Sequence, residues 1–365
     1  MPTTWLREPL AYVEASLRVA GENVRLEEQP GAREQEFLSV AFASALLLGV
    51  AVGGFFVLRY FGLWGEQDTA VFVEAITGLQ EAGLLVYPGS YGHGYAYPVW
   101  ASMLGSFTGV NVPNLLQVYT PLLGSLFLGL FGFAAFRRLL DSDRLGLLAA
   151  AVLFLVPELV FSISRGNHEK LTVALTLLAL LAMLMSYMEM FREGRWRVFA
   201  GWVVVFYFTT YTLVTLNAFF GSSFIVAATL TLIFAVLALR FRPGSEVQLG
   251  PVVRRLALIV GVSWALVVLV MWYVYPQAGA ILGVFNTALE RLGTLFLSFT
   301  PESDPYAVAT SDWASVSAYR MVSAFRWVLF IGSFLTWLVL LVRTLRRFEE
   351  TPVSRLFLPA LYGAL

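Results

Sequence analysis

Three short polar stretches carry the side chains of this sequence that could do chemistry. The first, 65–69, follows the first apolar run and contains Asp68. Asp68 stands near a predicted membrane boundary, where a carboxylate is costly unless it binds a cation, caps a helix or acts as a base. An amphipathic helix is predicted over 69–83, and Asp is a favoured N-cap residue. Asp68 is therefore a candidate base or cation ligand, and equally a candidate helix cap.

The second stretch, 87–98, is rich in glycine and aromatic residues. Its glycines allow tight turns, and Tyr91, Tyr95 and Tyr97 could stack on the apolar face of a sugar. Anchoring at the lipid interface is the commoner use of such aromatic side chains. His93 could act as a base, contact a phosphate or bind a metal ion, whereas a lone loop histidine is more often only solvated. The sequence leaves both interpretations open.

The third stretch, 162–170, holds Arg165, His168, Glu169 and Lys170, which is the one lysine of the chain. The predicted topology puts it on the external side, where Lys and Arg are depleted, so the two cations need an anionic partner. The phosphate of a lipid carrier fits, because Arg offers a planar fork and Lys a point charge. Snorkelling to lipid headgroups is the alternative. His168 and Glu169 could bind a metal ion or orient an acceptor, but two residues do not make a metal site.

The elements that must position these side chains are membrane helices. Hydrophobic residues make up 58% of the chain, charged residues only 13%, and the mean hydropathy is +0.75, which excludes a water-soluble globular domain. The apolar runs do not alternate in polarity as barrel strands would, so the predicted fold is all-α, a polytopic membrane helix bundle. The predicted spans are 37–58, 114–136, 145–161, 171–190, 198–217, 222–239, 256–275 and 321–342.

The distribution of charge predicts the orientation. Eighteen of the 24 Lys and Arg residues fall in alternate loops, beginning with the segment before the first span. Because such residues are retained in the cytoplasm, the N-terminus is predicted to be cytoplasmic and the long loop after the first span external. The apolar run 97–109 in that loop is too short to cross, so we expect a helix lying on the external face.

Two regions are predicted along the chain. Residues 1–36 form a cytoplasmic amphipathic segment, and residues 37–365 form the transmembrane domain. A last apolar run begins near residue 356 and is too short at Leu365 to cross, so we expect the chain to be the front part of a longer protein. The formal net charge of +0 gives no reason to expect a nucleic-acid partner, and the lack of cysteine excludes disulfides and cysteine nucleophiles.

The order of these parts resembles the GT-C superfamily of membrane glycosyltransferases, which includes protein O-mannosyltransferases, lipid A aminoarabinose transferases and the catalytic subunits of oligosaccharyltransferase. The resemblance covers 37–190 well and the rest only by hydropathy. The residues that carry it are Trp64-Gly65-Glu66-Gln67-Asp68 before a helix, Tyr97-Pro98 opening a surface helix, Pro121-Leu122-Leu123-Gly124, Phe136-Arg137-Arg138-Leu139, and Val156-Pro157 leading to Ser164-Arg165 and Glu169.

The resemblance implies an inverting transfer of a sugar from a polyprenyl-phosphate or polyprenyl-diphosphate carrier to a protein, lipid or glycan acceptor on the outer face. Asp68 would be the catalytic carboxylate, acting as a base or holding a divalent cation such as Mg or Mn. Arg165 and Lys170 would bind the donor phosphate, and Glu169 would stand for the family's second acidic residue. The chain departs from the pattern beside Asp68, where no second acid stands, and at His168, where an Asp is frequent.

Two alternatives belong to other classes. A transporter or flippase of a lipid-linked or anionic substrate would carry polar residues midway along broken helices, often in inverted repeats. The sequence shows no such repeat, and no broken helix is predicted, although Glu158 beside Pro157 lies away from the span ends. A non-catalytic GT-C-like assembly subunit is the other alternative. It would keep the fold without performing the transfer.

Overall fold

The fold is that of a computed structural model, which describes residues 32–60, 67–86, 90–192, 194–240, 249–280, 283, 316–348 and 353–364. Within these ranges every regular element is helical, which confirms the predicted all-α class. The predicted N-terminal segment lies outside them as far as residue 31. The first described helix, α2 (Ala32–Tyr60), begins inside that segment rather than at residue 37.

Seven helices among the described residues are long and apolar enough to cross a membrane, so the chain is an integral, multi-pass membrane protein. Each overlaps one of the predicted spans. They are α2, α6 (Thr120–Leu140) with the turns before it, α9 (Glu169–Met190), α10 (Trp196–Leu216), α11 (Ala218–Arg240), α12 (Leu249–Leu269) with the turn after it, and α15 (Val316–Arg346).

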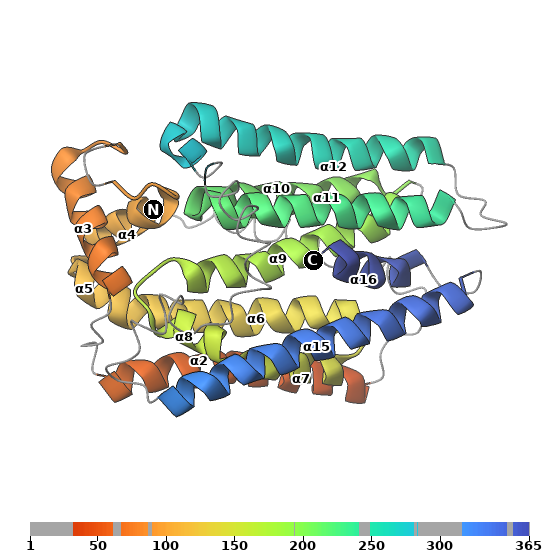
Figure 1. The fold of residues 1–365 in the computed structure, drawn as a ribbon, viewed down its shortest axis with the longest axis horizontal. Coiled ribbons are helices and arrows are strands. Elements are labelled where there is room, and N and C mark those ends of the chain that lie inside the picture. Colours follow the sequence, from red (N-terminus) through yellow and green to blue (C-terminus); the bar gives the residue numbers. More distant parts are fainter. Residues whose placement is uncertain are drawn as a thin grey trace, which may run out of the picture.

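The third predicted span is broken, which corrects the expectation that no helix is interrupted. Its residues form α7 (Asp143–Leu153) and α8 (Pro157–Ser164), and each is too short to cross alone. Proline at position 157 cannot donate a backbone hydrogen bond, and its ring clashes with the preceding helical turn. The chain tightens before it, with Leu155 N donating to Val152 O at 2.9 Å. Together the two helices carry the chain along α6 from one end of the bundle to the other (Figure 1).

Helix α6 lies at the centre of the first half of the bundle, with α2, α7 and α9 packed around it. Small residues allow α2 and α6 to approach closely, as is common between membrane helices. A Cβ added at Gly49 of α2 would lie 2.6 Å from the carbonyl oxygen of Ser125, and one at Gly129 of α6 would lie 2.6 Å from that of Ala45. Helices α9, α10 and α11 share a second apolar core, which includes Met183, Tyr187, Phe199, Phe206 and Leu232.

Three helices of the first loop gather at one end of the bundle (Figure 1). They are α3 (Gln67–Ala82), α4 (Ala96–Thr108) and the short α5 (Val112–Asn114), and α3 and α4 match the two surface helices that were predicted. We call this end, with residues 90–95 and 162–170, the loop end. We call the opposite end the arginine end. Arg137 and Arg138 stand there in the last turn of α6, and α10 begins there after Arg195.

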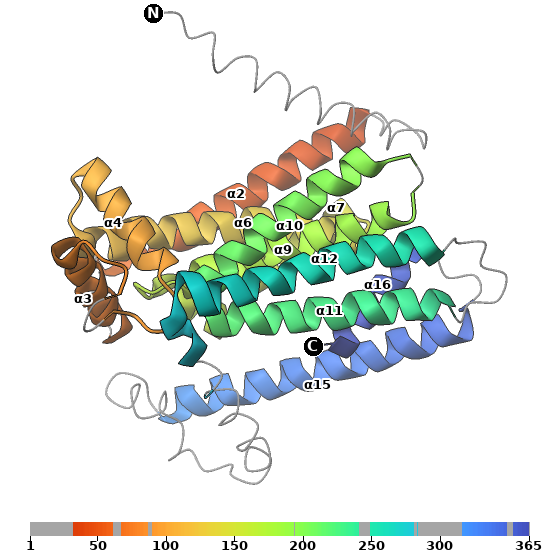
Figure 2. The same cartoon turned by 90° about the horizontal axis from the view of Figure 1, so that it is seen from above.

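The last described helices lie beside this bundle. Helix α16 (Val353–Ala364) packs against α11 and α9, and α15 packs against α16 (Figure 2). Side chains of α15 are widely exposed, Phe330 and Val339 among them, as expected for a helix that faces lipid.

Candidate functional site

The 162–170 turn, which joins α8 to α9 at the loop end, closes around the ammonium group of Lys170. This Nζ donates to the carbonyl oxygens of Arg165 and, at 2.9 Å, of Asn167. Lys170 is buried, and its methylene stem lies against Gly124 of α6, where an added Cβ would meet Lys170 Cδ at 2.7 Å. The lysine predicted to bind a donor phosphate therefore also holds the backbone of the turn in shape.

Arg165 and Glu169 form an ion pair within the same turn. Arg165 Nη1 lies 3.3 Å from Glu169 Oε2 and 3.4 Å from Oε1, and Ser162 Oγ donates to Oε2 at 3.0 Å. The arginine side chain is 6% exposed and the glutamate 24%, so the pair lies at the edge of the buried region. Glu169 also stands in the first turn of α9, where the helix dipole favours a negative charge. The arrangement orients a guanidinium group near the surface of the loop end.

The first turn of α3 contacts this turn directly. Gly166 N donates to Thr69 Oγ1 at 2.9 Å, and the Gly166 carbonyl accepts from the Tyr97 hydroxyl at 2.9 Å. A Cβ at Gly166 would lie 2.5 Å from Thr69 Oγ1, so the close approach requires glycine. Asp68 precedes Thr69 within the first turn of α3, which begins at Gln67, and its side chain lies outside the described part of the structure.

His168 is buried in the centre of this contact. Its ring is 3% exposed and lies near Phe72, Tyr91 and Tyr97, with ring centroids 5.4, 5.6 and 6.3 Å away. Nε2 is 2.9 Å from the amide nitrogen of Asn217. Burial, followed by the nearby charges of Lys170, His93 and Arg165, lowers the pKa of His168 to about 3. The side chain is thus a neutral imidazole near pH 7.

The three tyrosines predicted to stack on a substrate lie in different environments. Tyr91 is half-buried, and its ring centroid is 5.3 Å from that of the exposed His93. Tyr97 is fully buried under Phe72 and His168, and burial raises the pKa of its hydroxyl. The Tyr95 hydroxyl lies 2.9 Å from the Tyr211 hydroxyl of α10, and the two form a hydrogen bond. Only Tyr91 of the three lies beside both histidines.

Residues 90–95 are fastened to the ends of α10, α11 and α12. Ala218 N donates to the His93 carbonyl at 2.8 Å, and the Tyr275 hydroxyl donates to the Tyr91 carbonyl at 2.6 Å. Ser90 Oγ donates to Gln277 in the short helix η4 (Pro276–Ala280) at 2.8 Å. Sequence reasoning missed Tyr275, Gln277 and Asn217. Only Asn217, a helix-capping residue type between two apolar runs, carried a local signal.

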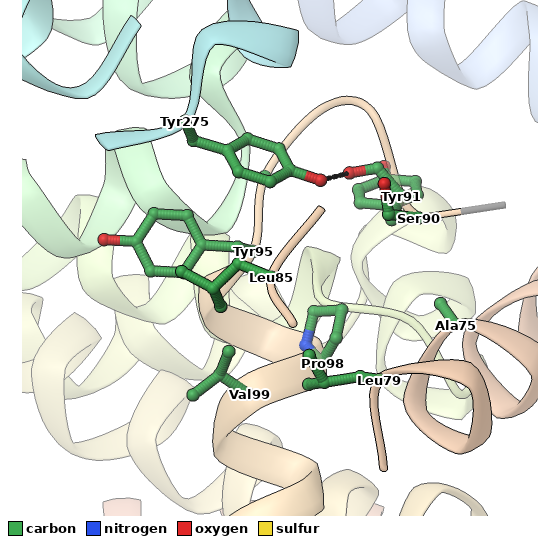
Figure 3. Close-up of a pocket in the computed structure, with 10 residues that line it drawn as sticks. Ala75, Leu79, Leu85, Ser90, Tyr91, Tyr95, Pro98, Val99 and Tyr275 are labelled. Atoms are coloured by element: carbon green, nitrogen blue, oxygen red, sulfur yellow. Dashed lines mark hydrogen bonds between the residues drawn. The ribbon is translucent and has the colours of Figure 1, made fainter. Parts of the chain in front are cut away.

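An apolar hollow opens next to this cluster (Figure 3). Its free volume is about 10 Å³, room for about one water molecule, and Tyr91 belongs both to its lining and to the ring group around His168. Figure 3 shows the hydrogen bond of the Tyr275 hydroxyl to the loop segment that carries Ser90 and Tyr91. The lining residues are Ala75, Leu79, Leu85, Ser90, Tyr91, Gly94, Tyr95, Pro98, Val99 and Tyr275. The charged turn and an apolar surface thus meet at Tyr91.

The described side chains do not by themselves provide a site for the expected divalent cation. No group of three or more His, Asp or Glu residues comes together within the ranges that the structure covers. Glu169 is the carboxylate that these ranges contribute to the cluster, and it is already paired with Arg165.

The site and the fold define a polytopic helical membrane protein with a charged, aromatic cluster at one end of its bundle. The chain matches no protein-family model, no curated protein and no solved structure.

Proposed function

We propose that this chain is a glycosyltransferase that moves a sugar from a polyprenyl-phosphate or polyprenyl-diphosphate carrier to an acceptor at the loop end. The observation that carries the proposal is the contact of Gly166 N with Thr69 Oγ1 at 2.9 Å. It brings the backbone of Asp68 beside the turn that contains Arg165 and Glu169. An acidic residue and a cationic turn at one end of a membrane bundle suit a lipid-borne phosphate and the acceptor that attacks its sugar.

In the proposed transfer, Asp68, Arg165, Glu169 and Ser162 have separate roles. An acceptor oxygen or nitrogen forms a bond to the anomeric carbon while the bond from that carbon to the phosphate oxygen breaks. The carrier leaves as its phosphate or diphosphate, whose added negative charge Arg165 stabilises through its planar fork. Asp68 takes the proton that the acceptor loses. Glu169 and Ser162 keep the guanidinium group in position.

The aromatic and apolar side chains beside the cluster support the same proposal from the side of the substrate. Tyr91 presents a half-buried ring between the hollow and the histidines. Aromatic rings bind the apolar faces of sugars, and hydrocarbon chains bind to leucine and valine side chains such as Leu79 and Val99. The lipid-linked donor combines these chemical groups with a phosphate.

The test is sugar transfer by the purified protein in proteoliposomes, with a panel of synthetic polyprenyl-phosphate sugars as donors and release of the polyprenyl phosphate as the readout. Asp68→Asn and Arg165→Ala are each expected to lower the rate by at least about a hundredfold, as loss of a base or of an oxyanion-type contact does. Glu81→Gln, on the exposed last turn of α3, and Arg144→Ala, exposed at the arginine end, are matched controls that should keep the rate.

Two results would overturn the proposal. One is the absence of transfer from every donor by wild-type protein that binds polyprenyl phosphate. The other is transfer that survives both Asp68→Asn and Arg165→Ala. Orientation can be tested in the same preparation, because the chain has no cysteine. Cysteine introduced at the exposed Gly92 is expected to react with an impermeant maleimide added outside cells, and cysteine at Arg144 is not.

A transporter of a lipid-linked or anionic substrate is the second candidate, and the break between α7 and α8 favours it. Transporters place substrate sites at interrupted helices near the middle of the membrane. Movement of an intact lipid-linked sugar across the bilayer, unaffected by Arg165→Ala, would favour this candidate over the transferase. Cleavage of the carrier's sugar bond would exclude it as the sole activity.

A further inference from the structure

Asn217 determines which nitrogen of His168 carries the proton. This residue lies between α10 and α11 and caps the N-terminus of α11. Its Oδ1 accepts from Phe219 N at 3.0 Å and from Phe220 N at 3.2 Å. The amide oxygen is therefore used by the helix, and the amide nitrogen faces His168 Nε2 at 2.9 Å. An amide nitrogen only donates, so Nε2 must accept. A neutral His168 consequently carries its hydrogen on Nδ1.

The Nδ1–H donor has no hydrogen-bond partner. Nδ1 is fully buried and unpaired within the part of the chain that the structure describes. A buried donor without an acceptor destabilises the fold, and such groups are rare in folded proteins. The cost is avoided when a ligand supplies the acceptor. His168 is thus a donor held in one tautomer beside the guanidinium of Arg165.

We propose that the Nδ1–H of His168 is a fixed, uncharged donor that hydrogen-bonds a phosphate oxygen of the lipid carrier, which Arg165 also binds. This inference rests on the proposed function, because it takes the ligand of the cluster to be a lipid-borne phosphate. His168 then serves neither as a base nor as a metal ligand. Asn217 is a positioning residue, since it acts only through His168.

The surroundings of His168 favour a neutral donor over a cation. Arg165 and Lys170 stand on its own turn, His93 on the 90–95 segment, and the phenols of Tyr91 and Tyr97 face the ring. Two of these groups are permanent cations near pH 7, so a third positive charge would be repelled. A neutral N–H adds a hydrogen bond to an anion without that repulsion. The competing explanation is that the N–H points at a ring face, such as that of Tyr91 or Phe72.

The first test reads the tautomer directly and requires no ligand. The chain has two histidines, so protein with 15N-labelled histidine gives two imidazole signals, which His93→Gln assigns. We expect His168 to carry hydrogen on Nδ1 and to keep an unchanged signal between pH 5 and pH 8. Hydrogen on Nε2, or titration of His168 near pH 6.5, would overturn the inference.

The second test exchanges the tautomer without removing the helix cap. In Asn217→Asp the carboxylate can still accept from the helix, because Asp caps as well as Asn. It can only accept from His168, so the neutral imidazole must move its hydrogen to Nε2 and turn a lone pair toward the phosphate. Protonation at lower pH restores Nδ1–H. The affinity of this variant for polyprenyl monophosphate, divided by that of wild type, should therefore fall about tenfold or more from pH 5 to pH 8.

The third test uses two replacements of His168 that differ in where they place a donor. His168→Gln reaches Asn217 but has no group at the Nδ1 position, whereas His168→Asn puts an amide there. Hydrogen bonds to charged groups contribute about 1.5–3 kcal/mol, so His168→Gln should weaken binding of polyprenyl monophosphate about tenfold to a hundredfold, and His168→Asn less. Inorganic phosphate, run in parallel, shows whether the lipid tail contributes to the affinity.

The outcomes separate this inference from the proposed function. If wild type binds polyprenyl monophosphate and Arg165→Ala abolishes binding, but His168→Gln and Asn217→Asp bind as wild type does at every pH, the donor role is wrong and the function stands. If wild type does not bind this lipid at all, both fail. Loss of binding in His168→Gln with partial retention in His168→Asn supports both, provided that the variants melt within a few degrees of wild type.

Discussion

The two ends of the bundle each pair a glutamate with arginines, but the pairs are built differently. At the arginine end, Glu189 is 1% exposed and lies 2.8 Å from Arg192 and 3.3 Å from Arg195. Arg255 of α12 donates to the last two carbonyl oxygens of α9, those of Glu189 and Met190, and to that of Arg192 just beyond the helix. At the loop end, Glu169 is 24% exposed, and Nδ1 of the neighbouring His168 is buried with no hydrogen-bond partner among the described residues.

The difference separates structural charge from charge that is available to a ligand. Arg255 donates to carbonyl groups at the C-terminal end of α9 and so ties α12 to α9. Arg195 is close to Glu189 Oε2 but is not aligned for a hydrogen bond, which makes it the weaker of the two contacts. At the loop end the ion pair lies in the same turn as His168 Nδ1, which is buried and which no described group satisfies. We interpret the first cluster as part of the fold and the second as part of the site.

The largest expected effect is on stability at the arginine end. Glu189→Gln removes the buried charge that pairs with Arg192 and Arg195, at a cost of up to about 3 kcal/mol, as expected for hydrogen bonds to a charged group. Thermal unfolding in detergent should show the loss, while the transfer rate per folded molecule stays unchanged. Asp143→Asn, which breaks the exposed pair with Arg137, is the control and should cost less than about 1 kcal/mol. Equal losses in both variants would contradict the comparison.

A methyl group at the contact between α3 and the 162–170 turn should disturb both stability and activity. In Gly166→Ala the new Cβ would lie 2.5 Å from Oγ1 and 2.6 Å from Cγ2 of the buried Thr69. Relieving this overlap is expected to cost about 2 kcal/mol and to lower the transfer rate. Gly261→Ala, whose Cβ would meet nothing within 4 Å, is the matched control for melting temperature and rate. A variant as active as that control would show that the contact is dispensable.

Acid should destabilise the loop end through His168. Its pKa is about 3 in the folded protein and about 6.5 when unfolded, so between these values the unfolded chain binds more protons. Stability is therefore full above about pH 6.5 and is lost as the pH falls toward 3, by about 2 kcal/mol at pH 5. The melting temperature measured from pH 7.5 to pH 5 should fall less in His168→Asn than in wild type. An equal fall in both proteins would contradict the prediction.

The smallest effect is expected from the glutamate of the loop end. Glu169→Gln keeps the shape of the side chain and its contact with Ser162, but loses the charge that orients Arg165. We expect the transfer rate to fall about tenfold, near 1.4 kcal/mol, with a loss of stability below about 1 kcal/mol. A loss of stability as large as that of Glu189→Gln would remove the distinction between the two ends.

Much of the fold was predictable because the membrane acts on composition. A span needs about 20 apolar residues, and seven of the predicted spans coincide with helices that are long and apolar enough. The surface helices α3 and α4 were predictable as well, from amphipathic spacing and from a length too short to cross. The break at Pro157 was missed, because hydropathy is blind to a backbone interruption within an apolar run.

The candidate site was predictable only in its residue types. Arg165, His168, Glu169 and Lys170 stood out because cations are rare on the predicted external side. Burial then separated similar residues: Tyr97 lies in the core, Tyr95 faces Tyr211, and Tyr91 remains beside the histidines. Sequence spacing could not anticipate this division, because residues two apart point in directions that depend on the local turn.

The sequence alone determined that this chain is a helical membrane protein, because the free energy of burying side chains in lipid depends on residue type and on the length of each run. Tertiary structure alone decided that Thr69 meets Gly166 and that Asn217 meets His168. These pairs are 97 and 49 residues apart, and their contact follows from how helices pack against one another. The charge state and the tautomer of His168 depend on that packing, since burial and a single amide neighbour set both.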